Sequence, residues 1–149
     1  MQKLKLTGAL LLTIAEFMTL AMSSASAKGA NDDSNAPVCS LNSLRGTYGY
    51  SFNGTVSPWG LLAGQGTLAF SGSGNLSGAY IENVNGILFQ GKFSGLFTVA
   101  ADCTGSATIT GLLHTWTVQL HFVIVDGGKE VLLLDTGAGK VVSGSAKKL

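Results

Sequence analysis

Apolar and polar side chains alternate at a spacing of two residues from Arg45 onward. This period is typical of β-strands that face a core on one side and solvent on the other, and no segment sustains a helical period. Gly, Asn and Asp residues, which favour turns, separate the alternating runs. We therefore predict strands over residues 47–52, 61–70, 76–84, 87–99, 106–110, 114–125, 129–135 and 140–148.

The connections between these strands leave no room for crossover helices, so successive strands are expected to form antiparallel hairpins. An all-β barrel or sandwich of about eight strands follows. Phrases such as "LSGAY" and "VSGSA" recur at irregular intervals, with glycines at positions 46, 78, 95, 105 and 144. A strand that bends or crosses closely over another requires a residue without Cβ. These glycines favour a single closed or nearly closed antiparallel β-barrel over a sandwich.

The stretch "FVIVDGGKEVLLLDT" raises the question of whether its glycines bind a ligand. Glycine loops that bind phosphate lead from a strand into a helix, whose N-terminus helps to hold the anion. Asp126-Gly127-Gly128 instead leads from one alternating run directly into the next. We therefore predict a hairpin with a primed turn at this position, and no ligand-binding loop.

The first residues have the layout of an export signal. A short basic start precedes an apolar run over residues 6–22, and small residues follow up to Ala27. This layout predicts a signal peptide, residues 1–27, cleaved after Ala27, and hence a secreted or periplasmic protein. Glu16 and the shortness of the apolar run disfavour the alternative, an uncleaved membrane anchor. No integral membrane span is expected after cleavage.

The remaining chain divides into two parts. Residues 28–43 begin with the polar, turn-rich stretch "KGANDDSNA" and are predicted to form a flexible lead-in. Residues 44–149 contain all the predicted strands and form the barrel domain. Two cysteines, Cys39 and Cys103, both lie in the exported part and are expected to form a structural disulfide, since the two make no CxxC motif.

Charge limits the partners of the exported chain. Removal of residues 1–27 leaves seven basic and seven acidic side chains, a formal net charge of zero. Nothing in this balance favours nucleic acid as a partner. Charged residues make up only 11% of the chain, so solubility depends on uncharged polar groups, and a homo-oligomer is an open expectation.

Metal or cofactor binding has little support. His114 and His121 fall in the same predicted strand, but their odd spacing places them on opposite faces. No cluster of Cys or carboxylate residues supplements them, and no nucleotide-binding or nucleophile motif is present. We therefore predict no metal site and no cofactor.

Glu82 is the one candidate catalytic residue. In "NLSGAYIENV" it shares a strand face with Leu76, Tyr80 and Val84, which predicts a carboxyl group directed into the barrel. Burial raises the pKa of an unpaired carboxyl, which suits it to act as an acid, as a base or as an anchor for a polar ligand head. The alternative is a rim position or a bulge that places Glu82 in solvent.

Aromatic residues supply the other candidate ligand contacts. Tyr48, Tyr50, Tyr80 and Trp116 carry hydroxyl or indole donors on inward-facing positions, although aromatic residues there also serve simply as core. Arg45 is expected to form a structural ion pair with Glu82 or Asp135, the alternative being a rim position. Asp135 is predicted to begin the turn "DTGAGK" through a local side-chain hydrogen bond.

Several stretches carry a resemblance to known proteins: "LRGTYGYSFNGTV", "LAFSGSGNLSGAY", "DCTGSATIT" and "FVIVDGGKEVLLLDT…GKVVSGSAKK". They resemble a group of small exported bacterial proteins without assigned function. More remotely, the strand count is similar to that of the allene oxide cyclase and dirigent barrels. This second resemblance implies a closed barrel with an apolar lumen, often as a trimer. No catalytic motif matches residue by residue, so cyclase activity does not follow.

Three functions remain open. The first is the binding of a small, largely apolar ligand in the lumen, with Tyr48, Tyr50, Tyr80, Glu82 and Trp116 as contacts. The second is a structural or surface-interaction protein whose barrel is packed with side chains. The third is a cyclase or isomerase that uses Glu82. The sequence favours a protein without enzymatic activity.

Overall fold

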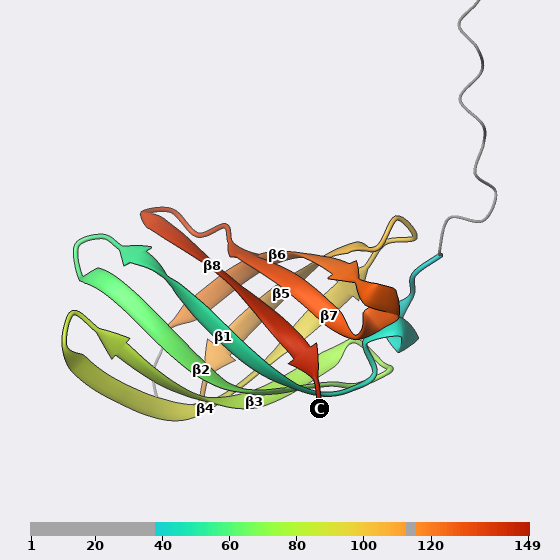
Figure 1. Cartoon of the computed structure of the whole chain (residues 1–149), viewed down its shortest axis with the longest axis horizontal. Helices are drawn as coiled ribbons and strands as arrows, with labels where there is room; N and C mark the ends of the chain where they lie inside the picture. Colours follow the sequence, from blue (N-terminus) through green and yellow to red (C-terminus); the bar gives the residue numbers. More distant parts are fainter. Residues whose placement is uncertain (1–37, 113–115) are drawn as a thin grey trace, which may run out of the picture. The chain divides into compact units, whose positions relative to one another are not determined.

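The computed structural model describes residues 38–112 and 116–149. Its strands form a closed antiparallel barrel in which each strand pairs with the next and β8 pairs with β1 (Figure 1). The strands are β1 (Gly46–Val56), β2 (Gly60–Phe70), β3 (Asn75–Val84), β4 (Ile87–Val99), β5 (Thr104–Gly111), β6 (Thr117–Val125), β7 (Glu130–Asp135) and β8 (Lys140–Lys148). The prediction of a closed all-β barrel is confirmed.

The strand boundaries follow the alternation closely. β4 and β8 begin and end where the pattern predicts. β1 continues beyond its predicted end at Phe52, because residues 53–56 stay in register with both β2 and β8. The predicted signal peptide, residues 28–37 of the lead-in and His114 lie outside the residues that the structure describes.

One end of the barrel is closed by a short 3-10 helix, η1 (Leu41–Leu44), which precedes β1. Leu44 and Tyr48 are fully buried there. The Tyr48 hydroxyl donates a hydrogen bond to the carbonyl oxygen of Gly128, in the turn between β6 and β7. A side chain at Gly128 would clash with the carbonyl oxygen of Ser43, so the turn meets η1 backbone to backbone. The closed end is therefore packed, and we refer to η1, Tyr48 and the turn at Gly128 together as the plug.

The turn between β6 and β7 confirms the hairpin predicted at Asp126-Gly127-Gly128. Val125 pairs with Glu130, so four residues make the connection, two more than in the shortest primed hairpin. Asp126, Gly127 and Gly128 have φ values of 48°, 61° and 87° and form a short 3-10 helix, η2 (Asp126–Gly128), so the hairpin is present but its turn is longer than the predicted primed turn. The glycines therefore serve the turn and its contact with η1.

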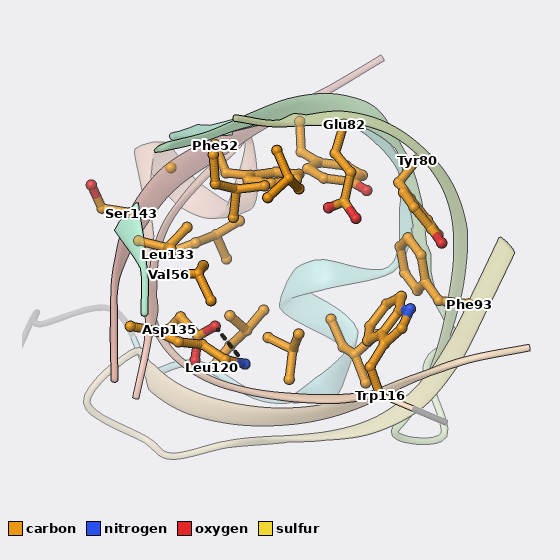
Figure 2. Close-up of a pocket in the computed structure, with 18 of the residues that line it drawn as sticks. Phe52, Val56, Tyr80, Glu82, Phe93, Trp116, Leu120, Leu133, Asp135 and Ser143 are labelled. Carbon is orange, nitrogen blue, oxygen red and sulfur yellow. Dashed lines mark ion pairs between the residues drawn. The ribbon is translucent and has the colours of Figure 1, made fainter. Parts of the chain in front are cut away.

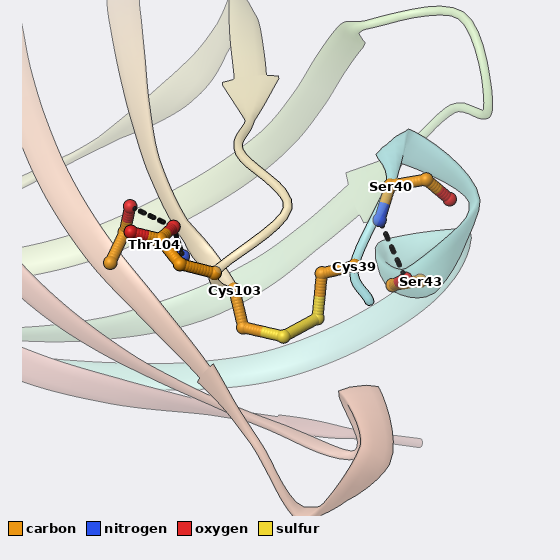
Figure 3. The surroundings of a disulfide bond; sticks show 6 residues. Cys39, Ser40, Ser43, Cys103 and Thr104 are labelled. Atoms are coloured by element: carbon orange, nitrogen blue, oxygen red, sulfur yellow. Dashed lines mark hydrogen bonds between the residues drawn. A yellow bond between two sulfur atoms is a disulfide. The ribbon is translucent and has the colours of Figure 1, made fainter. Parts of the chain in front are cut away.

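The predicted disulfide between Cys39 and Cys103 is present and is drawn in Figure 3. It joins the segment before β1 to the turn between β4 and β5. The backbone N–H of Cys39 also donates to the carbonyl oxygen of Ala101 at 3.1 Å. Residues 38–43, predicted as part of the flexible lead-in, are thus attached to the barrel. The alternation could not show this, because the attachment comes from the disulfide and η1.

Inward-facing glycines lie against the aromatic rings of adjacent strands. A Cβ at Gly105 would clash with the ring of Phe122 and with the carbonyl oxygen of Thr98, and Gly78 faces Phe93 in the same way. The close backbone approach expected at glycines 78, 95, 105 and 144 is confirmed, since a Cβ at each would meet a carbonyl oxygen of a neighbouring strand. Gly46 differs, because it has a φ of 137° and faces the Lys148 side chain.

The disulfide gives a first testable prediction. Replacing both cysteines (Cys39→Ser with Cys103→Ser) is expected to lower the free energy of unfolding by roughly 4 kcal/mol, because a long loop in the unfolded chain is no longer closed. Urea unfolding of the two proteins measures the difference. An unchanged transition midpoint and slope would show that the bridge contributes nothing to stability.

The glycine contacts give a second prediction. Gly105→Ala is expected to lower the free energy of unfolding by about 1–3 kcal/mol, because the added methyl group meets a backbone oxygen that cannot move aside. Gly49→Ala is the matched control, since a Cβ there would approach only the side chain of the terminal Leu149, at 3.3 Å. Equal losses in the two variants, measured by urea unfolding, would show that the close approach is not what requires glycine.

Candidate functional site

The half of the barrel opposite the plug encloses a cavity of about 790 Å³, seen from above in Figure 2. Val56, Val84 and Asp135, the last residues of β1, β3 and β7, lie at its mouth. Trp59, in the turn after β1, also borders it and is 68% exposed. The apolar and aromatic lining consists of Tyr50, Phe52, Val56, Trp59, Leu62, Leu68, Tyr80, Val84, Phe89, Phe93, Ile109, Trp116, Val118, Leu120, Leu133 and Val142.

Ring contacts hold much of one wall in place. Tyr50 stacks on Phe52 with ring centroids 5.8 Å apart and meets Phe93 edge to face at 6.2 Å. Tyr80 and Trp116 also meet edge to face, at 5.6 Å and 78°. Offset and edge-to-face pairs are the favoured arrangements of aromatic side chains. The sequence placed Tyr50, Tyr80 and Trp116 at the site, and all three line the cavity.

Glycines allow these rings to lie against the wall. A Cβ at Gly91 would lie 2.9 Å from the hydroxyl oxygen of Tyr80, and a Cβ at Gly111 would lie 2.6 Å from the ring of Trp116. Both distances are shorter than van der Waals contact allows. Each ring therefore occupies the space that a side chain on the adjacent strand would fill. The centre of the lumen stays open as a result.

Glu82 is half-buried in this wall, and its carboxyl group points into the cavity (Figure 2). It is in register with Gly64 on β2 and with Phe89 on β4. A Cβ at Gly64 would lie 2.9 Å from the Cβ of Glu82 and would also meet the ring of Phe52. The regular register through β3 contains no bulge, so the side chain keeps the inward direction that alternation predicts.

A second polar group lies on another side of the lumen. The Nζ atom of Lys140 is 3.3 Å from Oδ2 of Asp135, and both side chains line the cavity (Figure 2). The other carboxylate oxygen, Oδ1, accepts a hydrogen bond of 2.8 Å from the backbone N–H of Gly137. Asp135 thus forms the local turn hydrogen bond that was predicted and also an ion pair within the cavity wall.

Tyr48 lies away from the cavity that the sequence assigned it to. Its side chain is completely buried among the plug residues, its hydroxyl is bound to Gly128, and its ring packs edge to face on Phe70 at 5.4 Å. Alternation placed Tyr48 on the inner face correctly, but it carries no information on depth along the barrel. The structure gives Tyr48 a role in closing the barrel.

The ion pair predicted for Arg45 is wrong. Asp135 pairs with Lys140, and the strand register places Glu82 level with Phe52, seven residues along β1 from Arg45. Arg45 is exposed at the rim of the closed end, which was the alternative. Arg45 immediately precedes β1, which begins at the closed end of the barrel, whereas Glu82 and Asp135 line the cavity in the open half.

His121 is exposed on the outer face of β6, opposite Ser106. Within residues 38–112 and 116–149, no three His, Cys, Asp or Glu side chains are grouped so as to hold a metal ion. In the same ranges, no helix is long and apolar enough to cross a bilayer.

Phe52, Phe93 and Lys140 line the cavity but were not predicted as site residues. For the two phenylalanines a signal was available, because alternation places both on inner strand faces. For Lys140 the signal was the short turn "DTGAGK", which brings it back beside Asp135. The predicted role of Asp135 in that turn did not extend to the cavity.

The tyrosines in the barrel differ from free tyrosine in their pKa. Burial raises the pKa of the Tyr50 phenol far above its usual value, and the negative charge of Glu82 and the nearby Tyr80 phenol raise it further. Burial also raises the pKa of Tyr48. The Tyr50 hydroxyl donates a hydrogen bond of 3.3 Å to the carbonyl oxygen of Ala79. Tyr50 therefore stays a neutral donor beside Glu82 at physiological pH.

Comparisons with known proteins give the fold alone. No family model and no curated protein matches the chain. The redesigned β-barrel b11L5F_LGL is similar at 18% identity and a TM-score of 0.54, over 74% of this chain and 95% of that one. Two further redesigned β-barrels, both bound to DFHBI, are also similar. The barrel mFAP0 is similar at 21% identity and a TM-score of 0.53, over 71% of this chain and 99% of that one. The barrel mFAP1 is similar at 18% identity and a TM-score of 0.56, over 73% of this chain and 98% of that one.

The raised pKa of Tyr50 predicts how stability depends on pH. Above about pH 10 the unfolded chain loses the phenol proton of Tyr50, whereas the folded protein keeps it. The contribution of Tyr50 to the free energy of unfolding is therefore complete below about pH 10 and is lost as pH rises above that value. Urea unfolding between about pH 9 and pH 11 should show a smaller decline for Tyr50→Phe than for the wild type. Equal declines would contradict the assignment.

Proposed function

We propose that this protein is an exported β-barrel that binds a small, largely apolar ligand in the open half of its lumen. The observation that carries the proposal is the cavity of about 790 Å³, which has a mostly apolar and aromatic lining and only a few polar groups. Ligand pockets in proteins commonly have this size and this composition. Two redesigned barrels of similar fold are bound to a small molecule, DFHBI, which supports the same use of a lumen.

The structural alternative, a barrel packed with side chains, fits the closed half of the molecule but not the open half. Around the plug, Phe70 packs on Phe97 with ring centroids 4.9 Å apart, and Leu44 and Phe122 are almost completely buried. At the mouth, inward-facing side chains such as Trp116 and Leu120 remain partly exposed. A barrel that served only as a rigid surface would gain stability from filling this space. The hollow half favours ligand binding.

The cyclase or isomerase alternative depends on Glu82. The carboxyl group is within the cavity and the neutral Tyr50 phenol is close to it, so an acid or base is available to a bound molecule. Ligand binding requires fewer features than catalysis, namely a shaped apolar space and one polar group that anchors the ligand. We therefore favour a binding protein, and turnover that disappears in Glu82→Gln would overturn that preference.

Export and assembly are part of the proposal. The basic start, the apolar run and the small residues up to Ala27 support cleavage and release into the periplasm or the medium. The disulfide is consistent with an oxidising compartment. A relationship to the allene oxide cyclase and dirigent barrels, and the trimer that it implies, stay predictions.

We predict that filling the cavity weakens ligand binding. Leu120→Trp combined with Leu133→Trp places two large rings among the lining residues, and affinity for the neutral fluorescent probe N-phenyl-1-naphthylamine is expected to fall by about tenfold or more. Fluorescence titration of the purified mature protein measures the affinity.

The matched control makes the same substitutions on the outer face. Leu132 and Leu134 are 48% and 49% exposed on β7, and Leu132→Trp with Leu134→Trp should leave probe affinity unchanged. Circular dichroism checks that both variants fold. Failure of the wild-type protein to bind the probe, or equal affinity in the two double variants, would argue for the structural alternative.

A further inference from the structure

We infer that the open end of the barrel docks on an uncharged lipid bilayer, with the tips of three hairpins inserted into the bilayer interface. This inference goes beyond the proposed function, because it assigns a partner to the outside of the barrel and holds whether or not the lumen binds a ligand. Three features carry it: the apolar side chains that the tips expose, the distribution of charge along the barrel, and the hydrogen bonds that the tips make among themselves.

The hairpins that connect β7 to β8, β1 to β2 and β3 to β4 form one continuous edge at the mouth of the cavity (Figure 1). The backbone N–H of Ser57 donates to the carbonyl oxygen of Gly139 at 2.8 Å, which joins the first two tips. The backbone N–H of Asn85 donates to the carbonyl oxygen of Leu61 at 2.8 Å, which joins the second and third. We call these tips the mouth hairpins: residues 55–62, 83–89 and 136–141.

The mouth hairpins expose large apolar side chains. Trp59 is exposed for most of its surface, although tryptophan side chains are usually well buried. Four aliphatic side chains of the same hairpins are also largely exposed: Leu61, Ile87, Leu88 and Val141. Apolar groups gathered in this way mark interaction surfaces. Tryptophan and leucine are the side chains that proteins commonly place at the interface of a bilayer.

Charge is distributed unevenly along the barrel axis. Lys140 is the one charged residue of the mouth hairpins, and its Nζ atom is 3.3 Å from the carboxylate of Asp135. The closed end carries many more charged side chains, namely Arg45, Asp102, Asp126, Lys129, Glu130, Lys147 and Lys148. Removing charged groups from water is costly unless they are paired. The open end therefore suits the interface of an uncharged bilayer, and the closed end suits water.

The tips also satisfy backbone groups internally, which lets them leave water at low cost. Besides the two hydrogen bonds that join the hairpins, the N–H of Gly86 donates to Oδ1 of Asn83 at 2.8 Å. Leu61 and Leu88 lie outside the cavity lining, so their side chains are available to lipid. A barrel docked in this way opens its lumen toward the acyl chains, which gives an apolar ligand a path that avoids water.

A second copy of the chain fits the mouth hairpins less well. The hairpins stand beside the opening of a hollow, so two facing copies would touch along an edge and leave the space between them unfilled. Stable protein interfaces are closely packed and bury about 800 Å² on each partner. A fluid bilayer adapts to an uneven edge of this kind, and we therefore favour lipid as the partner.

The test measures the insertion of Trp59 into lipid. Trp116→Phe leaves Trp59 as the single tryptophan. Phosphatidylcholine vesicles brominated on their acyl chains are expected to quench Trp59 and to shift its emission to the blue. The readout is local to the mouth, so binding of another segment of the chain to lipid does not by itself produce it. Adding Leu61→Gln and Leu88→Gln should lower the partition coefficient by about tenfold or more, because two apolar side chains no longer leave water.

Leu96→Gln with Leu149→Gln is the matched control, because it replaces two exposed leucines at the closed end. It should leave the partition coefficient unchanged, and circular dichroism checks that both double variants fold. Absence of quenching, or equal losses in the two double variants, would overturn the inference. Binding that requires anionic lipid and disappears in salt would also overturn it. The same holds for a dimer, seen by analytical ultracentrifugation, that Leu61→Gln with Leu88→Gln dissociates while Trp59 stays unquenched by vesicles.

Binding of N-phenyl-1-naphthylamine, measured without vesicles, separates this inference from the proposed function. Neither Leu61 nor Leu88 lines the cavity, so the double variant should keep the wild-type affinity for the probe. Probe binding without insertion of Trp59 would overturn this inference alone. Insertion without probe binding would support the inference and count against the proposed function alone.

Discussion

The packing of aromatic rings against glycines is the constraint on which both halves of this barrel depend. Glycines on adjacent strands leave room for aromatic rings, and a Cβ at any of these glycines would collide with a ring. The rings are those of Tyr50, Phe52, Tyr80, Phe93, Trp116 and Phe122. Several of the same glycines also let neighbouring strands approach more closely than a side chain permits. Closure of the sheet and placement of the rings are therefore one packing solution.

The two ends of the barrel use this solution differently. At the plug, η1 and the disulfide bring Leu44 over the lumen, and Phe70, Phe97 and Phe122 fill the space beneath it. At the mouth no such element lies over the lumen in the described residues, and rings held on Gly91 and Gly111 leave the centre open. The completely buried Leu44 and Tyr48 thus lie at one end, and the candidate binding site lies at the other. Such a division lets the site keep partly exposed apolar groups without loss of the fold.

The fold and much of the site could be predicted from the sequence for a specific reason. Strand alternation determines which face of the sheet a residue occupies, so the inward direction of Glu82, Tyr50, Tyr80 and Trp116 follows directly from parity. Depth along the barrel axis depends on the register between strands, and parity does not give it. Tyr48 was therefore assigned to the cavity although it belongs to the plug. The same lack of register produced the incorrect ion pair for Arg45.

A high-resolution crystal structure of the protein tests the central claim most directly. We predict that the rings of Phe52, Tyr80 and Trp116 lie against the glycines of adjacent strands and that a hollow remains beside Glu82, occupied by ligand or by water. Aromatic side chains turned inward to fill the lumen, with no cavity at the mouth, would contradict it.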